Sequence, residues 1–144
     1  MIARVLIADN DPDILELISA LLNEEGFETI AFTDGLAALH AIRTERPAVA
    51  IIDLAMPVMD GWELIRRLRS EPGKRVPVIA MSAAMYEPPQ DLLQVDAYLS
   101  KPFDLEELLE YVQDLAFRAD RMVRTSADGE PTLLPLRHSI PGPH

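Results

Sequence analysis

Polar residues with chemically useful side chains follow four of the five short apolar runs in this 144-residue sequence. Asp9 and Asn10 come after the first run, Asp53 after the third, Ser82 after the fourth and Lys101 after the fifth. Carboxylate and amide oxygens can coordinate a hard cation, and a carboxylate can also act as a nucleophile. A hydroxyl can hydrogen-bond an anionic group, and an ammonium can neutralise it. These residues could therefore form one reactive site if the fold brings them together.

The apolar runs alternate with segments of helical periodicity. β-Favouring residues predict strands over 1–8, 27–32, 49–54 and 76–81, and a weaker strand over 97–99. Helical spacing predicts helices that begin at Pro12, near Asp34, near Gly61 and near Leu105, where Asp104 and Glu107 suggest a capping box. Strands separated by crossover helices pair in parallel, so the pattern indicates an α/β fold with helices on both faces of the sheet.

The carboxyl ends of parallel strands share one edge of the sheet, and ligands bind there at the point where the strand order reverses. This rule brings Asp9, Asn10, Asp53, Ser82 and Lys101 to one edge. The alternation of strands and helices is interrupted at 83–95. Pro88 and Pro89 cannot lie inside a helix there, so we expect only a short or irregular fourth helix at 90–95. We expect the ordered domain to cover residues 1–120, with the last helix ending near Arg124, and residues 121–144 to be a disordered tail or linker.

The composition narrows the class of protein. The chain is 49% hydrophobic, contains no cysteine and carries 24 acidic against 13 basic residues, a net charge of −11. An acidic surface repels polyanions, so we expect no direct nucleic-acid binding. The sequence has no run of roughly 18 apolar residues and no leader pattern, so we expect no membrane insertion and a cytoplasmic location. Absence of cysteine excludes disulfides and thiolate sites.

Three motifs resemble the receiver domain of two-component response regulators. They are Asp53-Leu-Ala-Met-Pro-Val-Met-Asp-Gly, Ala80-Met-Ser-Ala and Lys101-Pro-Phe, each at the expected strand end within residues 2–117. The resemblance implies a flavodoxin-like, doubly wound, five-stranded parallel sheet of order 2-1-3-4-5. It also implies that Asp53 accepts a phosphoryl group from a sensor histidine kinase or a histidine phosphotransfer protein. The signal would then pass to an unknown downstream protein by contact, which is the role of a signalling module and not of an enzyme.

The resemblance also implies which residues would bind the metal, stabilise the phosphoryl group and form the switch. Mg²⁺ would be held by Asp9, Asn10, Asp53 and the backbone carbonyl of Ala55, while Lys101 and Ser82 would stabilise the phosphoryl group. Ser82 and Tyr98 would form the switch, and Pro102 matches the family's cis bond after the lysine. Asp11 is better explained as a helix cap than as a ligand, and Asp60 and Gly61 as structural residues. His40, His138 and His144 lack acidic partners, so we expect them to be solvated.

Asn10 departs from the family pattern, which places a second acid there. An amide oxygen can coordinate Mg²⁺ but brings no charge, so metal affinity should be weakened. A second hypothesis follows, a pseudo-receiver that binds partners without stable phosphorylation. A third is a small Mg²⁺-dependent phosphohydrolase, but Ala55 stands where such enzymes place their general acid.

Overall fold

The computed structural model of the chain describes residues 2–73, 75–83 and 95–127. Five parallel strands form one sheet in the order β2-β1-β3-β4-β5. The strands are β1 (Arg4–Ala8), β2 (Glu28–Phe32), β3 (Val49–Asp53), β4 (Val78–Ala83) and β5 (Ala97–Lys101). The helices are α1 (Pro12–Glu24), α2 (Gly35–Glu45), α3 (Gly61–Ser70) and α4 (Leu105–Ala127). The predicted strand order is thus confirmed.

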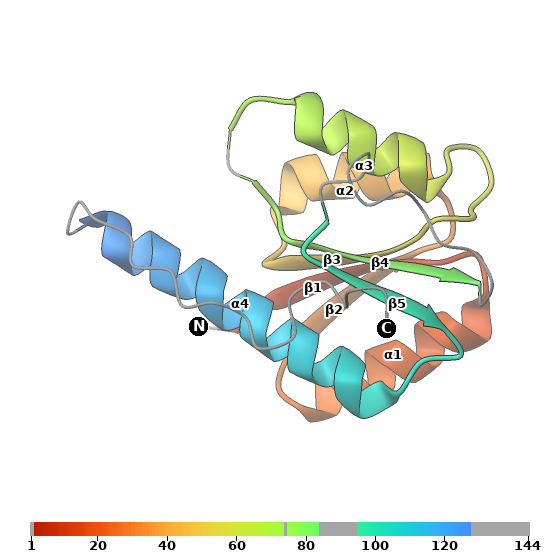
Figure 1. The fold of residues 1–144 in the computed structure, drawn as a ribbon, viewed down its shortest axis with the longest axis horizontal. Coiled ribbons are helices and arrows are strands. Elements are labelled where there is room, and N and C mark those ends of the chain that lie inside the picture. Colours follow the sequence, from red (N-terminus) through yellow and green to blue (C-terminus); the bar gives the residue numbers. More distant parts are fainter. Residues whose placement is uncertain (1, 74, 84–94, 128–144) are drawn as a thin grey trace.

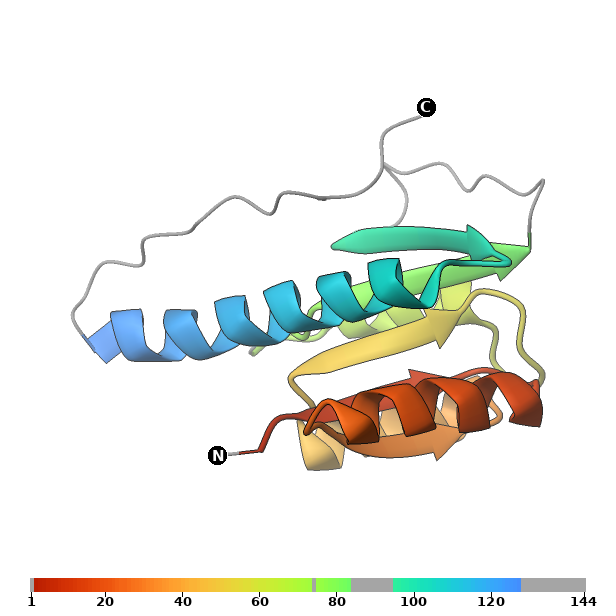
Figure 2. The ribbon, with the colours of Figure 1, turned by 90° about the horizontal axis from the view of Figure 1, so that it is seen from below.

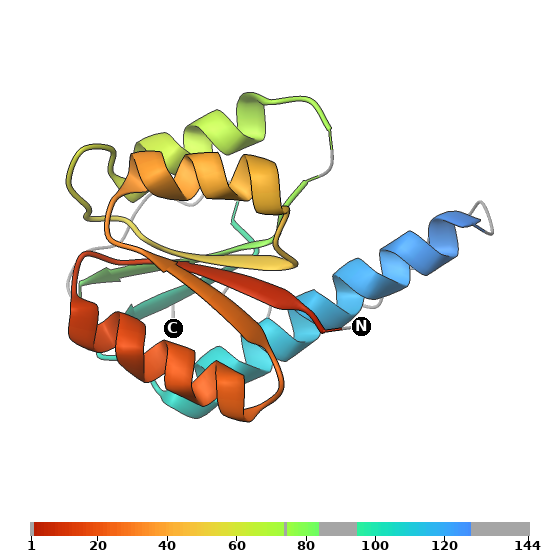
Figure 3. The same ribbon diagram turned by 180° about the vertical axis from the view of Figure 1, so that it is seen from behind.

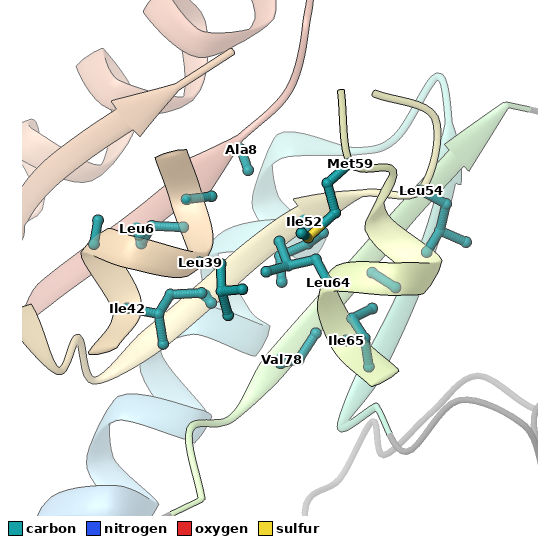
Figure 4. Close-up of a cluster of buried hydrophobic side chains, with 14 of the residues drawn as sticks. Leu6, Ala8, Leu39, Ile42, Ile52, Leu54, Met59, Leu64, Ile65 and Val78 are labelled. Carbon is teal, nitrogen blue, oxygen red and sulfur yellow. The ribbon is translucent and has the colours of Figure 1, made fainter. Parts of the chain in front are cut away.

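The sheet is the middle of three layers. Figure 1 shows α2 and α3 on one face and α1 and α4 on the other, and the views from below and behind agree (Figures 2 and 3). Two apolar cores fill the gaps. The core under α2 and α3 includes Leu6, Ile52 and Leu64 (Figure 4), and the core under α1 and α4 includes Ile18, Ile51 and Val112. Because both faces are covered, the central strands β1 and β3 are almost continuously apolar.

Local capping explains where the helices begin. The side chain of Asp11 accepts a hydrogen bond from the backbone N–H of Asp13, and Pro12 is the first residue of α1, as predicted. Asp34 and Asp60 cap α2 and α3 in the same way. Asp104 accepts from the N–H of Glu106 at the start of α4. These caps fix the first turn of every described helix.

The structure shifts some strand ends relative to the sequence prediction. β4 begins at Val78 and not at residue 76, because Pro77 has no N–H and the carbonyl of Val76 accepts a hydrogen bond from Arg69. β4 and β5 also run further than predicted, to Ala83 and Lys101, since these two residues pair with each other in the sheet. Such pairing between distant segments is invisible to local sequence patterns.

Asp96 fastens the start of β5 to β4. Its backbone N–H donates to the carbonyl of Val78 and its side chain accepts from the N–H of Val78, both at 2.8 Å. The other carboxylate oxygen accepts from Arg75 at 2.8 Å, and the guanidinium of Arg69 lies 3.5 Å from the carboxylate. This cluster joins α3, β4 and β5 at the sheet edge opposite the carboxyl ends.

Helix α4 has 23 residues and extends well past the sheet (Figures 1 and 3). It ends at Ala127, beyond the boundary at 120 that the sequence suggested, so the first residues of the expected tail are helical. The expected fourth helix at 90–95 and the rest of the expected tail lie outside the described residues. None of the described helices is long and apolar enough to cross a membrane.

Candidate functional site

The four strand ends meet at one edge of the sheet. Asp9 follows β1 directly, Asp53 is the last residue of β3, Ser82 lies one residue before the end of β4, and Lys101 ends β5. Asp9, Asp53 and Ser82 are the buried polar residues of the described chain, at 0%, 3% and 2% exposure. Burial of two carboxylates is costly unless a positive charge compensates them.

Lys101 supplies that charge. Its ammonium Nζ donates to Oδ2 of Asp9 at 2.8 Å and to Oδ2 of Asp53 at 3.2 Å. The two carboxylates, from different strands, therefore converge on one cation. The lysine side chain remains 23% exposed, so the ammonium group is only partly shielded from solvent.

Backbone amides hold the other carboxylate oxygens. Oδ1 of Asp9 accepts from the N–H of Asp11 at 2.8 Å, and Oδ1 of Asp53 accepts from the N–H of Ala55 at 3.1 Å. In each carboxylate, one oxygen thus accepts a backbone N–H from the following loop, and the other accepts from the ammonium of Lys101. This arrangement fixes the orientation of both acids without a further side chain.

Burial and charge shift the proton affinities in the site. Burial raises the pKa of Asp53 above its ordinary value, and the negative charge of Asp9 adds to the rise. The Ala55 amide and Lys101 act in the opposite direction without cancelling it. Burial alone would lower the pKa of Lys101, but the hydrogen bond to Asp9 and the charges of Asp53 and Asp9 raise it.

The oxygen donors fit a hard divalent cation. The carboxylates of Asp9 and Asp53 already converge on the ammonium of Lys101. Asn10 and the Ala55 carbonyl lie close to them in the chain, and together these oxygens are of the kind that Mg²⁺ prefers. Asn10 is exposed, and Asp11 accepts a hydrogen bond from the N–H of Asp13 as the cap of α1. Among the described residues no group of three or more His, Cys, Asp or Glu could hold a metal.

Ser82 and Tyr98 lie on the neighbouring strands β4 and β5, and their hydroxyl groups share a hydrogen bond. Tyr98 is half-buried and packs against the core under α2 and α3. The two predicted switch residues are therefore in direct contact with each other, at the same edge of the sheet as Asp9 and Asp53. His40 is exposed on α2, as expected, while His138 and His144 lie outside the described residues.

The loop between β3 and α3 is held tightly against the end of β3. The N–H of Gly61 donates to the carbonyl of Leu54 at 3.0 Å. A Cβ on Gly61 would lie 2.3 Å from the carbonyl oxygen of Asp53, so glycine is required for space. Asp60 caps α3, which agrees with the structural roles predicted for this pair.

Sequence reasoning missed Gly35, which contacts the same loop from α2, and the anchoring role of Asp96. A glycine as the first residue of a helix was the available signal for Gly35, because glycine is a poor helix former. Nothing local distinguishes Asp96 from an ordinary surface acid, since its partners lie on other elements.

Residues 5–113, which include every site residue described above, match the family of the response regulator receiver domain. The chain belongs to that family. Its relatives include the response regulator GtcR of Aneurinibacillus migulanus, 38% identical over 122 residues that cover 83% of this chain and 50% of GtcR. An uncharacterised 14.6 kDa protein of Leptolyngbya boryana is 39% identical over 122 residues, 81% of this chain and 93% of that protein. The receiver chain thus spans about half the length of GtcR.

Solved receiver domains have the same architecture. The receiver domain of the Francisella response regulator 1452 is 36% identical, with a TM-score of 0.74 over 81% of this chain and 98% of that one. The receiver domain of the Pseudomonas aeruginosa sensor histidine kinase PA1611 is 29% identical, with a TM-score of 0.72 over 81% and 99%. The latter structure contains a magnesium ion coordinated in the active-site cleft.

Proposed function

We propose that this receiver domain accepts a phosphoryl group on Asp53 from a phosphohistidine of a sensor histidine kinase or a histidine phosphotransfer protein. The signal then passes to a downstream protein by contact. The observation that carries the proposal is the shared contact of Lys101 with Asp9 and Asp53. A cation and a second acid thus lie beside the buried carboxylate of Asp53, which supports a nucleophilic role for Asp53.

The phosphoryl group moves directly from the imidazole of the phosphohistidine to Asp53. A carboxylate oxygen of Asp53 attacks phosphorus, so that a P–O bond forms as the P–N bond to imidazole breaks. The bonding pair stays on the imidazole nitrogen, which takes up a proton. Lys101 offsets the negative charge of the incoming group, and the hydroxyl of Ser82 donates to a phosphoryl oxygen. The Ala55 amide keeps the Asp53 carboxylate oriented during the reaction.

Asp9, Asn10, Asp53 and the Ala55 carbonyl are the residues that would hold Mg²⁺. The ion, when bound, neutralises charge on the phosphoryl oxygens. Because Asn10 is neutral, the site carries only two acidic ligands, and we expect weaker binding of the metal than with an acid at this position.

The contact between Ser82 and Tyr98 supports a switching role for both residues. If the Ser82 hydroxyl turns to a phosphoryl oxygen, its hydrogen bond with Tyr98 is exchanged for a stronger, charge-assisted one. Tyr98 then loses this hydrogen bond to β4, and we expect its side chain to change position on β5. The phosphorylation state of Asp53 is thereby coupled to the surface around the edge strand.

The test is intact mass spectrometry after incubation with MgCl₂ and acetyl phosphate. We expect one added phosphoryl group in the wild type and none in Asp53→Asn or in protein treated with EDTA. Because rapid hydrolysis would hide the adduct, beryllofluoride binding followed by ¹⁹F NMR provides a second measurement. Failure of both in the presence of millimolar MgCl₂ would overturn the proposal.

A pseudo-receiver that binds its partner without stable phosphorylation is the second candidate, and Asn10 is the observation that favours it. Isothermal titration with MgCl₂ separates the two. Metal binding in the millimolar range or tighter supports the phosphoacceptor, whereas no binding by the wild type together with binding by Asn10→Asp supports the pseudo-receiver.

A further inference from the structure

Gly35 is the first residue of α2 and is buried. Glycine disfavours helix because it retains the most conformational freedom in the unfolded chain. Among the described glycines, Gly26 and Gly73 have positive φ angles that explain their identity, whereas Gly35 does not. The reason for glycine at this position must therefore be space and not backbone conformation.

The space is taken by the loop that follows β3. A Cβ on Gly35 would lie 1.9 Å from the carbonyl oxygen of Met59 and 2.8 Å from its carbonyl carbon. Both atoms belong to the backbone, so no side-chain rotation could relieve the overlap. Met59 itself is 8% exposed, and its side chain packs into the core under α2 and α3 (Figure 4). The start of α2 and this loop therefore pack backbone against backbone.

The contact falls on a strained turn. The N–H of Met59 donates to the carbonyl of Pro57 at 2.7 Å, which closes a three-residue γ-turn with Val58 at its centre. Val58 has a φ of 69°, a conformation that is rare for a β-branched residue. Its side chain is 80% exposed and cannot hold the turn by packing. Strain of this kind persists only where the surroundings impose it, and Gly35 is a neighbour whose backbone meets the turn at Met59.

The same loop carries the groups that orient Asp53. Its first residues include Ala55, whose N–H donates to Oδ1 of Asp53 and whose carbonyl is a proposed metal ligand. Where the loop leaves β3, the backbone of Gly61 packs against that of Asp53. The N–H of Leu54 also donates a hydrogen bond to the carbonyl of Met81. The loop is thus clamped at both ends, by glycines on two different helices.

We propose that Gly35 is a positioning residue, which holds the turn Pro57–Met59 in place from α2 and thereby fixes Ala55 against Asp53. The part of this inference that concerns the metal rests on the proposed function. The part that concerns the orientation of Ala55 does not, because it can be measured in metal-free protein.

The test compares Gly35→Ala with Gly26→Ala. Gly26 has a φ of 94° and no atom within 4 Å of a Cβ, so its replacement strains the fold without touching the loop. In metal-free protein we expect the Ala55 amide to shift in ¹H–¹⁵N spectra and to exchange about tenfold faster in Gly35→Ala, and to be unchanged in Gly26→Ala. For MgCl₂ we expect the dissociation constant to rise about tenfold in Gly35→Ala only.

Asp34→Ala provides a second variant in case Gly35→Ala does not fold. It removes the cap that holds the first turn of α2, so the same loss of Ala55 protection is expected at a lower cost in stability. If both variants leave the Ala55 amide as it is in the wild type, the inference is wrong. If the wild type binds no MgCl₂ and takes up no phosphoryl group, the proposed function fails, while the amide measurements still decide the role of Gly35.

Discussion

The ammonium of Lys101 lies 2.8 Å from a carboxylate oxygen of Asp9, although 92 positions separate the two residues in the chain. Lys101 ends the edge strand β5, and Asp9 follows the central strand β1. Only the parallel arrangement of the sheet brings them together. The same ammonium reaches Asp53, so one positive charge compensates two buried negative ones.

Removing that positive charge should destabilise the domain. Lys101→Met leaves Asp9 and Asp53 buried side by side, and we expect a loss of about 1–3 kcal/mol in the free energy of unfolding, less than for a fully buried pair because the lysine is partly exposed. Urea unfolding followed by circular dichroism measures the loss. Addition of MgCl₂ should restore much of the stability, since a second cation can then offset both acids. Lys101→Arg, which keeps the charge, is the control, and equal stability of Lys101→Met and wild type would contradict the prediction.

Replacing Asp53 should have the opposite effect. Because burial and Asp9 raise its pKa in the folded state, the stability that this group contributes is complete below its unfolded pKa and is lost as pH rises through its folded pKa. The ionised carboxylate therefore weakens the fold at pH 7. We expect Asp53→Asn to raise the Tm by about 2–5 °C at pH 7 and to lose this advantage as pH falls through the raised pKa. Thermal unfolding at several pH values tests this, and a lower Tm at pH 7 would contradict it.

The helices were predictable from the sequence because their signals are local. Asp11, Asp34 and Asp60 are capping residues whose partners lie within three positions, and the predicted start of α3 near Gly61 is confirmed. The convergence of the strand ends also followed from sequence, since it depends only on parallel topology. The contact of Gly35 with Met59 could not be predicted, because it joins two segments that are well separated in the chain. The start of β4 was misjudged although Pro77 gave a local signal, since a proline has no N–H to donate to a neighbouring strand.

Asp96 should be far more important for stability than its partner Arg75. Its side chain is 13% exposed, accepts the N–H of Val78 and faces the buried guanidinium of Arg69. We expect Asp96→Ala to cost about 2–4 kcal/mol, because the N–H of Val78 loses its acceptor and the guanidinium of Arg69 loses a nearby opposite charge. Arg75→Ala removes a half-exposed partner and should cost less than about 1 kcal/mol. Chemical denaturation of both variants tests the difference, and similar costs would argue against an anchoring role for Asp96.

Tyr111 should give the domain a sensitivity to alkaline pH. Burial, together with the charges of Glu107 and Glu110, raises its pKa to about 12. A raised pKa means that stability from this group is complete below pH 10, its ordinary range, and is lost as pH rises toward 12. Ultraviolet titration of the wild type and of Tyr111→Phe should assign to Tyr111 an ionisation near pH 12. Tyr111→Phe should lessen the fall in stability between pH 10 and pH 12, and an unchanged fall would count against the assignment.

The length of α4 has a mechanical consequence. At 1.5 Å per residue its 23 residues make a rod of about 35 Å, roughly twice the length of the strand β5 that precedes it. Only the residues 102–104 separate the rod from Lys101, so its base is tied to the site. A tilt of about 5° at the base would carry the far end through about 3 Å. A rearrangement at Asp9 and Asp53 that tilted the base of α4 would therefore be amplified at the far end of the helix.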